Sequence, residues 1–253
     1  MNFTLVQYSP LWEEVDNNKK KLEELLKANK PEPGVIIFPE MSLTGFTMNP
    51  ESFAESLEGE SIKYFKEISR RYSSSVIAGV ILTENDSFFN TIIHLDKTGE
   101  LIKVYKKIHP FSFGDENKHY KAGSEIVITE IEGIKTGLSI CYDLRFPELY
   151  RYYGKEKVDL IINIANWPIT RIHHWRVLLR ARAIENLCYV IGVNRVGTDP
   201  KLTYNGYTSV FDPMGEEMLC NINDEKISSL ELSFSTVREV RDRFPFLNDI
   251  KLI

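Results

Sequence analysis

Three short apolar segments that run directly into polar or reactive side chains constrain the fold of this chain most strongly. They are residues 35–38 before Pro39-Glu40, residues 137–140 before Cys141, and residues 161–164 before Ala165-Asn166. Residues 35–38 form a continuous apolar run, which is typical of a strand that is buried on both faces, and the other two segments also indicate buried strands. In open α/β sheets, ligands bind beyond the carboxyl ends of the strands, so we expect these three ends to converge on one crevice.

The remaining pattern alternates between strands and helices. We expect strands at residues 3–7, 35–38, 76–82, 90–95, 100–106, 126–130, 134–140, 159–164, 190–193, 208–211 and 228–232, and helices at 12–27, 62–72 and 171–187. Buried strands mixed with helices and hairpins indicate an α/β sandwich. No linker or low-complexity segment divides the sequence, which predicts a single domain over residues 1–253.

Charge and composition exclude several classes of partner. The formal net charge of -5 and the lack of a basic stripe argue against nucleic acid. No apolar stretch approaches membrane-spanning length, and the N-terminus lacks the pattern of a signal peptide, so we expect no membrane association. The three cysteines are too few and too scattered for a disulfide framework or a zinc site, which favours the reducing cytoplasm.

The polar residues at the strand ends have structural as well as chemical interpretations. A cysteine after an apolar strand, such as Cys141, usually serves as a small buried hydrophobe. Glu40 would be costly to bury without a partner. Lys107 ends the strand at 100–106, and its neighbour Lys106 leaves the choice of lysine open. Together they match the needs of amide cleavage, which are a nucleophile, a base and a cation near the developing oxyanion.

At these residues the sequence resembles the nitrilase superfamily of carbon–nitrogen hydrolases. The matching segments are Phe38-Pro39-Glu40-Met41, Tyr105-Lys106-Lys107-Ile108-His109 and Cys141-Tyr142-Asp143-Leu144-Arg145-Phe146-Pro147-Glu148. Three distant motifs in the correct order are a specific signal, and the similarity extends nearly end to end. The resemblance implies a four-layer αββα sandwich, a homodimer and no metal or organic cofactor.

The resemblance also implies roles for individual residues. Glu40 becomes the general base and Cys141 the nucleophile. The lysine two residues before the histidine of the family's Lys-x-His pattern is Lys107, and the backbone N–H of Tyr142 joins it at the oxyanion. A second glutamate, here Glu116, is expected to order the lysine, although a surface loop carboxylate is the alternative interpretation.

Within the superfamily, residues 165–168 and 189–197 resemble the omega-amidase branch, whose enzymes deamidate 2-oxoglutaramate and 2-oxosuccinamate. Such substrates carry a carboxylate distal to the amide, and its recognition calls for a cation or hydrogen-bond donors. Arg145 is the candidate, with a structural ion pair as the alternative that the sequence favours. Trp167 and Phe46 are candidates for the pocket wall, or for core aromatics.

We therefore expect an amidase that releases ammonia from a small-molecule amide, with omega-amidase activity as the first hypothesis. The alternatives are another amidase of the superfamily, acting on N-carbamoyl or aliphatic amides, and a catalytically silent homologue that serves as an interaction module. The retention of Glu40, Lys107 and Cys141 argues against a silent homologue, because such a module has no need for a buried carboxylate, a cation and a thiol together.

Overall fold

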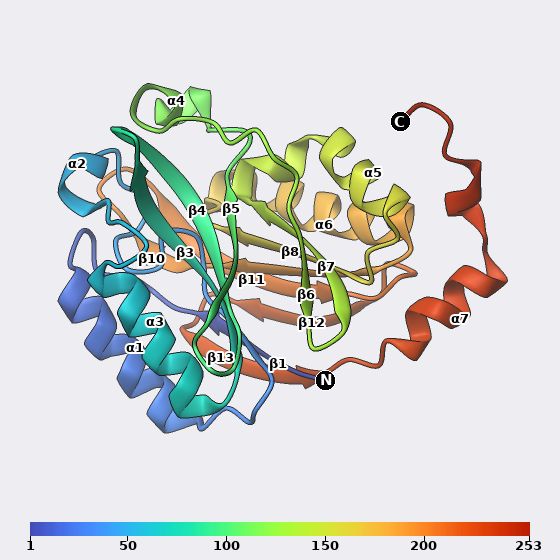
Figure 1. Ribbon diagram of the computed structural model, residues 1–253, viewed down its shortest axis with the longest axis horizontal. Coiled ribbons are helices and arrows are strands. Elements are labelled where there is room, and N and C mark those ends of the chain that lie inside the picture. The colour runs from blue at the N-terminus through green and yellow to red at the C-terminus, as the bar shows by residue number, and fades with distance from the viewer.

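The computed structural model describes all 253 residues, and it consists of two β-sheets packed face to face with helices on both outer sides (Figure 1). The predicted four-layer αββα sandwich is therefore confirmed. No helix is long and apolar enough to cross a membrane.

The first sheet has the strand order β13-β1-β2-β3-β4-β5. Its strands are β1 (Asn2–Gln7), β2 (Val35–Ile37), β3 (Ser75–Glu84), β4 (Ser87–Leu95), β5 (Leu101–Lys106) and β13 (Lys226–Glu231). β1, β2 and β3 are parallel, and the remaining neighbours pair antiparallel. Helices α1 (Val15–Asn29) and α3 (Glu60–Tyr72) cover the outer face of this sheet (Figure 1).

The second sheet has the order β10-β11-β9-β8-β7-β6, with β12 paired to β11. Its strands are β6 (Ile128–Ile131), β7 (Ile134–Ile140), β8 (Leu160–Ala165), β9 (Tyr189–Asn194), β10 (Val196–Thr198), β11 (Thr203–Phe211) and β12 (Glu217–Ile222). The central strands β7, β8 and β9 are parallel. Helices α5 (Pro147–Lys155) and α6 (Ile172–Asn186) pack on its outer face.

Alternation along the strands divides the core into layers. On β2, Val35 and Ile37 face the cluster between the two sheets, whereas Ile36 faces the cluster under α1 and α3. Because successive side chains of a strand point to opposite faces, a strand that is apolar throughout must be covered on both sides. The uninterrupted apolar runs in the sequence therefore correspond to the inner strands of the sandwich.

The helix expected from residue 12 begins instead at Val15. Residues 11–14 form a turn in which Glu13 has a left-handed φ of 59°. The Asn18 side chain holds this turn, because its Oδ1 accepts from Leu11 N and its Nδ2 donates to Leu11 O, both at 2.7 Å. A helical backbone would not present both groups of Leu11 to one amide side chain.

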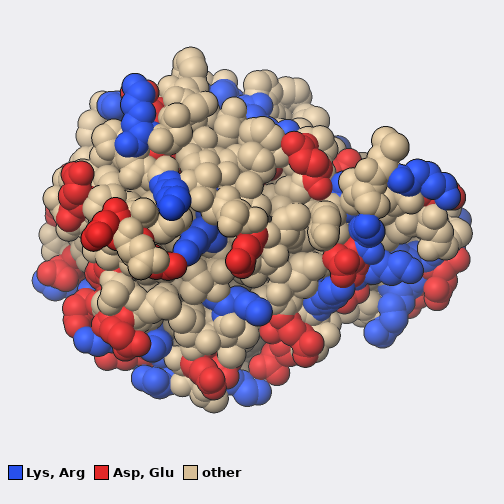
Figure 2. All heavy atoms as spheres, turned by 45° about the horizontal axis from the view of Figure 1, so that its top comes forward, with Lys and Arg blue, Asp and Glu red and all other residues tan.

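Several elements were not predicted from the sequence. Besides α5, β10 and β12, these are the short helices α2 (Pro50–Phe53) and α4 (Glu116–His119) and the helix α7 (Ser235–Arg243). The α7 helix and the residues after it protrude from the sandwich (Figures 1 and 2). The sequence of α7 is mostly polar, so it carries little of the apolar periodicity on which a helix prediction depends.

Candidate active site

The three polar strand ends meet in one crevice, and they come from both sheets. Glu40 follows β2 of the first sheet, whereas Cys141 and Asn166 follow β7 and β8 of the second. The Asn166 backbone N–H donates to Glu40 Oε2 at 2.8 Å, and its side-chain Nδ2 donates to the Glu40 carbonyl at 2.8 Å. The crevice therefore lies where the two sheets face each other at the carboxyl ends of their parallel strands.

Cys141 occupies a sharp turn between β7 and the 3-10 helix Cys141–Arg145. Its φ of 46° is left-handed, a conformation that non-glycine residues adopt rarely and at an energetic cost. Asn163 of β8 supports the turn, because its Oδ1 accepts from Cys141 N at 3.1 Å. The turn directs the thiol away from the strand and into the crevice.

Glu40 reaches the site because β3 has a glycine beneath it. A Cβ at Gly79 would lie 2.5 Å from Met41 N, 2.6 Å from Pro39 O and 2.7 Å from Glu40 Cα. All three contacts are to backbone, which cannot move aside as a side chain can. Only glycine therefore lets the chain after β2 cross over β3 this closely.

Lys107 lies directly after β5, and its ammonium group is fully enclosed by the protein. Its Nζ lies 2.9 Å from Glu40 Oε1 and 2.8 Å from Glu116 Oε2. The neighbouring Lys106 points the other way and pairs with Glu84 at the surface, with 2.5 Å between Nζ and Oε2. The alternation of side chains at the end of β5 thus separates the two lysines.

Glu116, the first residue of α4, is completely buried. Besides its contacts to Lys107, it accepts from the backbone N–H of Phe111 at 2.6 Å. A fourth side chain joins the two carboxylates, since Asn90 Nδ2 donates to Glu40 Oε1 at 2.7 Å and to Glu116 Oε1 at 2.8 Å. Glu40, Glu116, Lys107 and Asn90 therefore form one buried network.

Two carboxylates face a single ammonium group in this network. Burial and this excess of negative charge together shift the pKa values of its groups and of Cys141. Burial disfavours the charged form of Lys107, but Glu116 and Glu40 outweigh it and hold the pKa of Lys107 well above its usual range. Burial, reinforced by Glu40 and opposed by Lys107, raises the pKa of the Cys141 thiol well above normal. Burial also raises the pKa of Glu116, against the effect of Lys107. A neutral thiol at rest needs a base to remove its proton during attack.

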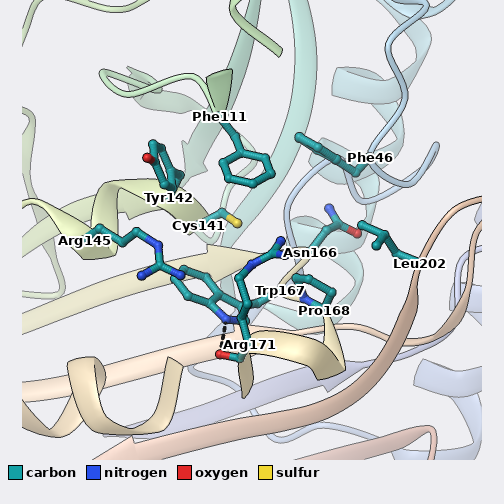
Figure 3. A pocket seen from close by; sticks show the side chains of 10 residues that line it. All are labelled: Phe46, Phe111, Cys141, Tyr142, Arg145, Asn166, Trp167, Pro168, Arg171 and Leu202. Atoms are coloured by element: carbon teal, nitrogen blue, oxygen red, sulfur yellow. Dashed lines mark hydrogen bonds between the residues drawn. The ribbon is translucent and has the colours of Figure 1, made fainter. Parts of the chain in front are cut away.

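The thiol opens into a small inner chamber of about 30 Å³. Its lining residues are Phe46, Phe111, Cys141, Tyr142, Arg145, Asn166, Trp167, Pro168, Arg171 and Leu202. Figure 3 shows the Cys141 sulfur below the Phe111 ring, toward the middle of this group. The chamber is mostly apolar, and no acidic side chain lines it. Such a lining suits a short carbon chain.

The four residues expected to bind substrate all line the inner chamber, namely Phe46, Tyr142, Arg145 and Trp167. Trp167 is held in its wall from two sides, by hydrogen bonds of its backbone N–H to Asn194 Oδ1 and of its Nε1 to Arg171 O. The prediction that Arg145 forms a structural ion pair is wrong. Its guanidinium contacts no carboxylate and instead donates to His174 Nδ1 at 3.1 Å, above the Trp167 ring.

Sequence reasoning missed Asn90, Gly79 and Arg171 as site residues. Asn90 begins the apolar segment 90–95 and carries no motif of its own, and Arg171 only marked the start of a predicted helix. Gly79 interrupts an otherwise apolar, β-branched strand, which is a recognised sign of close backbone approach. That signal was available in the sequence, but it does not identify the segment that approaches.

Comparisons with known proteins identify a matching family model and several similar proteins. A family model for carbon-nitrogen hydrolases matches residues 3–242. The 2-oxoglutaramate amidase of Bacillus subtilis is 32% identical over 97% of this chain and 96% of its own length. The 2-oxoglutaramate amidase of Paenarthrobacter nicotinovorans is 39% identical over 85% and 77%, and omega-amidase YafV of Escherichia coli K12 is 34% identical over 98% and 96%.

Solved structures show the same fold. A CN-hydrolase superfamily protein from Xanthomonas campestris superposes with a TM-score of 0.94 at 32% identity, covering 100% of this chain and 98% of that one. Its crystal structure contains an arsenic adduct in the active site. Nit3 of Saccharomyces cerevisiae, a member of the nitrilase superfamily, has a TM-score of 0.87 at 22% identity, with 97% and 94% of the two chains covered.

Proposed function

The chain belongs to the carbon–nitrogen hydrolase family, and from that premise we propose that it is an omega-amidase that deamidates 2-oxoglutaramate or 2-oxosuccinamate. That it is an amidase acting on a small-molecule C–N bond follows from the family and from its relatives. The buried network of Lys107 with Glu40 and Glu116, beside the Cys141 turn, is the observation that carries the mechanism.

In the proposed first step, Cys141 Sγ attacks the amide carbon while Glu40 takes the thiol proton. Lys107 Nζ and the Tyr142 backbone N–H stabilise the negative oxygen of the tetrahedral intermediate. The carbon–nitrogen bond then breaks, and Glu40 returns the proton to the leaving nitrogen, which departs as ammonia. A thioester between the acyl group and Cys141 remains.

In the second step, Glu40 takes a proton from water, whose oxygen attacks the thioester carbon. The carbon–sulfur bond breaks, and the thiolate regains the proton through Glu40. Both Glu40 oxygens are hydrogen-bonded, Oε1 to Lys107 and Asn90 and Oε2 to the Asn166 N–H. These contacts keep the carboxylate in one orientation through both proton transfers. Glu116 positions Lys107 and does not itself exchange protons with the substrate.

Ammonia release from a small panel of compounds tests this proposal. The panel contains 2-oxoglutaramate, glutamine, an N-carbamoyl amino acid and a simple nitrile. We expect 2-oxoglutaramate to have the highest kcat/KM and Cys141→Ala to abolish turnover. Preference for the N-carbamoyl compound would make the chain a different amidase. No turnover of any compound, with Cys141 inert to iodoacetamide, would favour a silent homologue. Turnover that survives Cys141→Ala would contradict the mechanism.

We also propose a homodimer in a reducing compartment, the cytoplasm. Large apolar side chains that are about half exposed, Val177, Ile184, Met214 and Met218, support an interface on and beside α6. The three unpaired cysteines support the compartment. Light scattering on the purified protein would reveal a monomer if the first proposal is wrong, and cell fractionation tests the second.

A further inference from the structure

Arg171 holds an unpaired cation at the mouth of the inner chamber. It ends the short 3-10 helix Ile169–Arg171 that leads into α6. Its carbonyl accepts from Trp167 Nε1 at 2.7 Å, but its guanidinium forms no hydrogen bond and no ion pair. The guanidinium rests against the Phe111 ring, with 5.3 Å between Cζ and the ring centroid. Figure 3 shows this side chain rising in front of Trp167 toward Phe111 and ending beside the Cys141 sulfur.

Arg171 also lines a second, larger cavity of about 330 Å³ outside the inner chamber. The two cavities share four lining residues, Phe46, Phe111, Arg171 and Leu202. The inner chamber is much smaller than the outer cavity, at about 30 Å³ against about 330 Å³. A substrate chain that extends from Cys141 toward the outer cavity passes the junction where Arg171 lies.

The acidic side chains of the outer cavity are engaged elsewhere. Asp115 pairs with Lys118, with 2.8 Å between the charged atoms. Asp199 accepts from the Tyr204 hydroxyl at 2.5 Å and from the backbone of its own turn, at Lys201 N and Leu202 N. Neither carboxylate lies within ion-pair distance of Arg171, so the protein supplies no anion for this guanidinium.

Arg145 differs from Arg171 in this respect. It also lines the inner chamber, but it is already committed to His174 and to the Trp167 ring. Arg171 is oriented only by stacking on Phe111, which leaves its planar set of N–H donors open. A guanidinium in this state can bind a carboxylate through two parallel hydrogen bonds without breaking an existing one.

We propose that Arg171 selects anionic amides for this active site: its guanidinium binds the distal carboxylate of the substrate while the amide carbon lies against Cys141. The proposal rests on the amidase function above and assigns the residue that sets its charge preference. Phe111 connects the two ends of the site, because its ring supports Arg171 while its backbone N–H donates to Glu116.

Two matched substrates test the charge preference, namely succinamate and butanamide, which differ by a carboxylate in place of a methyl group. In Arg171→Gln we expect KM for succinamate to rise at least about tenfold and kcat/KM for butanamide to change less than about threefold. Arg171→Lys should recover part of the loss, because it keeps the charge but not the two-pronged geometry. Arg180→Gln, on α6 and outside both cavities, is the control. Equal losses for both substrates, or none, would overturn the proposal.

A binding measurement separates this inference from the proposed function. Levulinate is the methyl ketone analogue of succinamate and has no amide to cleave, so its protection of Cys141 from iodoacetamide reports binding alone. The concentration that halves the alkylation rate should rise at least about tenfold in Arg171→Gln, and 2-pentanone should protect weakly in both proteins. Protection that depends on Arg171 in a protein that cleaves no amide would refute only the function. The inference would be refuted if levulinate protected Cys141 equally well in the wild type and in Arg171→Gln. It would also be refuted if levulinate gave the wild type no protection.

Discussion

Asp143 Oδ1 accepts two hydrogen bonds from His109, one from its backbone N–H at 3.0 Å and one from its ring Nδ1 at 2.7 Å. Its other oxygen accepts from the Tyr105 hydroxyl at 2.7 Å and from Ile140 N at 2.9 Å. One buried carboxylate thus joins the segment that carries Lys107 to the turn that carries Cys141. The lysine and cysteine motifs are held together by a residue that takes no part in the proposed proton transfers.

Asp143→Asn should damage both stability and activity. The amide keeps one acceptor oxygen but turns an NH₂ group toward two of the four donors. One of these two is always a backbone N–H, of Ile140 or His109, and it is left unsatisfied. We expect a loss of roughly 3 kcal/mol in the free energy of unfolding, measured with urea, and at least a tenfold fall in kcat. Tyr105→Phe removes a single donor and should cost only about 1 kcal/mol. Wild-type stability in Asp143→Asn would contradict the role assigned to these contacts.

Lys107→Met and Lys106→Met form a matched pair on adjacent residues. Loss of Lys107 removes the oxyanion cation and leaves Glu40 and Glu116 buried without their partner. We expect a fall in kcat of at least about 100-fold and a stability loss of roughly 3 kcal/mol. Lys106→Met removes an ion pair with Glu84 and a contact with the Phe89 ring, both outside the buried network, so kcat should stay within about twofold. Similar losses in the two variants would refute the distinction between these lysines.

Asn90→Leu tests whether the bridge between the two carboxylates positions them. The substitution keeps the branching and the number of side-chain heavy atoms but removes the N–H groups that face Glu40 and Glu116. We expect kcat to fall about 10- to 100-fold with KM within about threefold, because a displaced base loses more in the transition state than in binding. The control is Thr91→Val on the same strand, whose hydroxyl bonds Val80 O. A rise in KM alone would point to a substrate-binding role instead.

Gly79→Ala should displace Glu40. The added methyl group would meet three backbone atoms at 2.5 to 2.7 Å, so the chain after β2 must shift. We expect a stability loss of about 1–3 kcal/mol and at least a tenfold loss of kcat. Gly133→Ala provides the comparison, because its φ of 83° is unfavourable for alanine but no atom lies near the added methyl group. That variant should lose about 1 kcal/mol and keep its kcat.

His94 makes stability depend on pH. Burial lowers its pKa from 6.5 to about 4, and its Nδ1 lies 2.7 Å from Thr129 Oγ1. As the pH falls, His94 is protonated near pH 6.5 in the unfolded chain but only near pH 4 in the folded chain. The stability that neutral His94 contributes is therefore present above pH 6.5 and is lost as the pH falls toward 4. Between pH 7 and pH 5 the loss should be roughly 2 kcal/mol.

Urea unfolding at the two pH values, in the wild type and in His94→Asn, measures this effect. The asparagine can still bond Thr129 but does not titrate. The His94→Asn variant should be less stable than the wild type at pH 7. Its free energy of unfolding should also change less between pH 7 and pH 5, by the amount that His94 contributes. Equal pH dependence in the two proteins would show that His94 accepts a proton in the folded state without cost.

The sequence by itself determined the inner strands of the sandwich and the chemistry at their ends. Apolar runs such as residues 35–38 can be stable only between two covering layers, so they predicted the inner strands of a sandwich. The ordered motifs at Glu40, Lys107 and Cys141 indicated the family and selected one lysine of two. These features are local in the chain, and each depends on neighbouring residues or on a short pattern.

Only the tertiary structure decided how the site is assembled. Glu40 and Asn166 are 126 residues apart yet hydrogen-bonded, and Asn90 meets two carboxylates from other elements. The first contact depends on the packing of one sheet against the other. The contacts of Asn90 depend on the order of strands within the first sheet and on the position of α4, and no local pattern encodes either. For the same reason Arg171 could be recognised only in the folded chain. That a cation lacks a partner is a property of everything that surrounds it, not of its own segment.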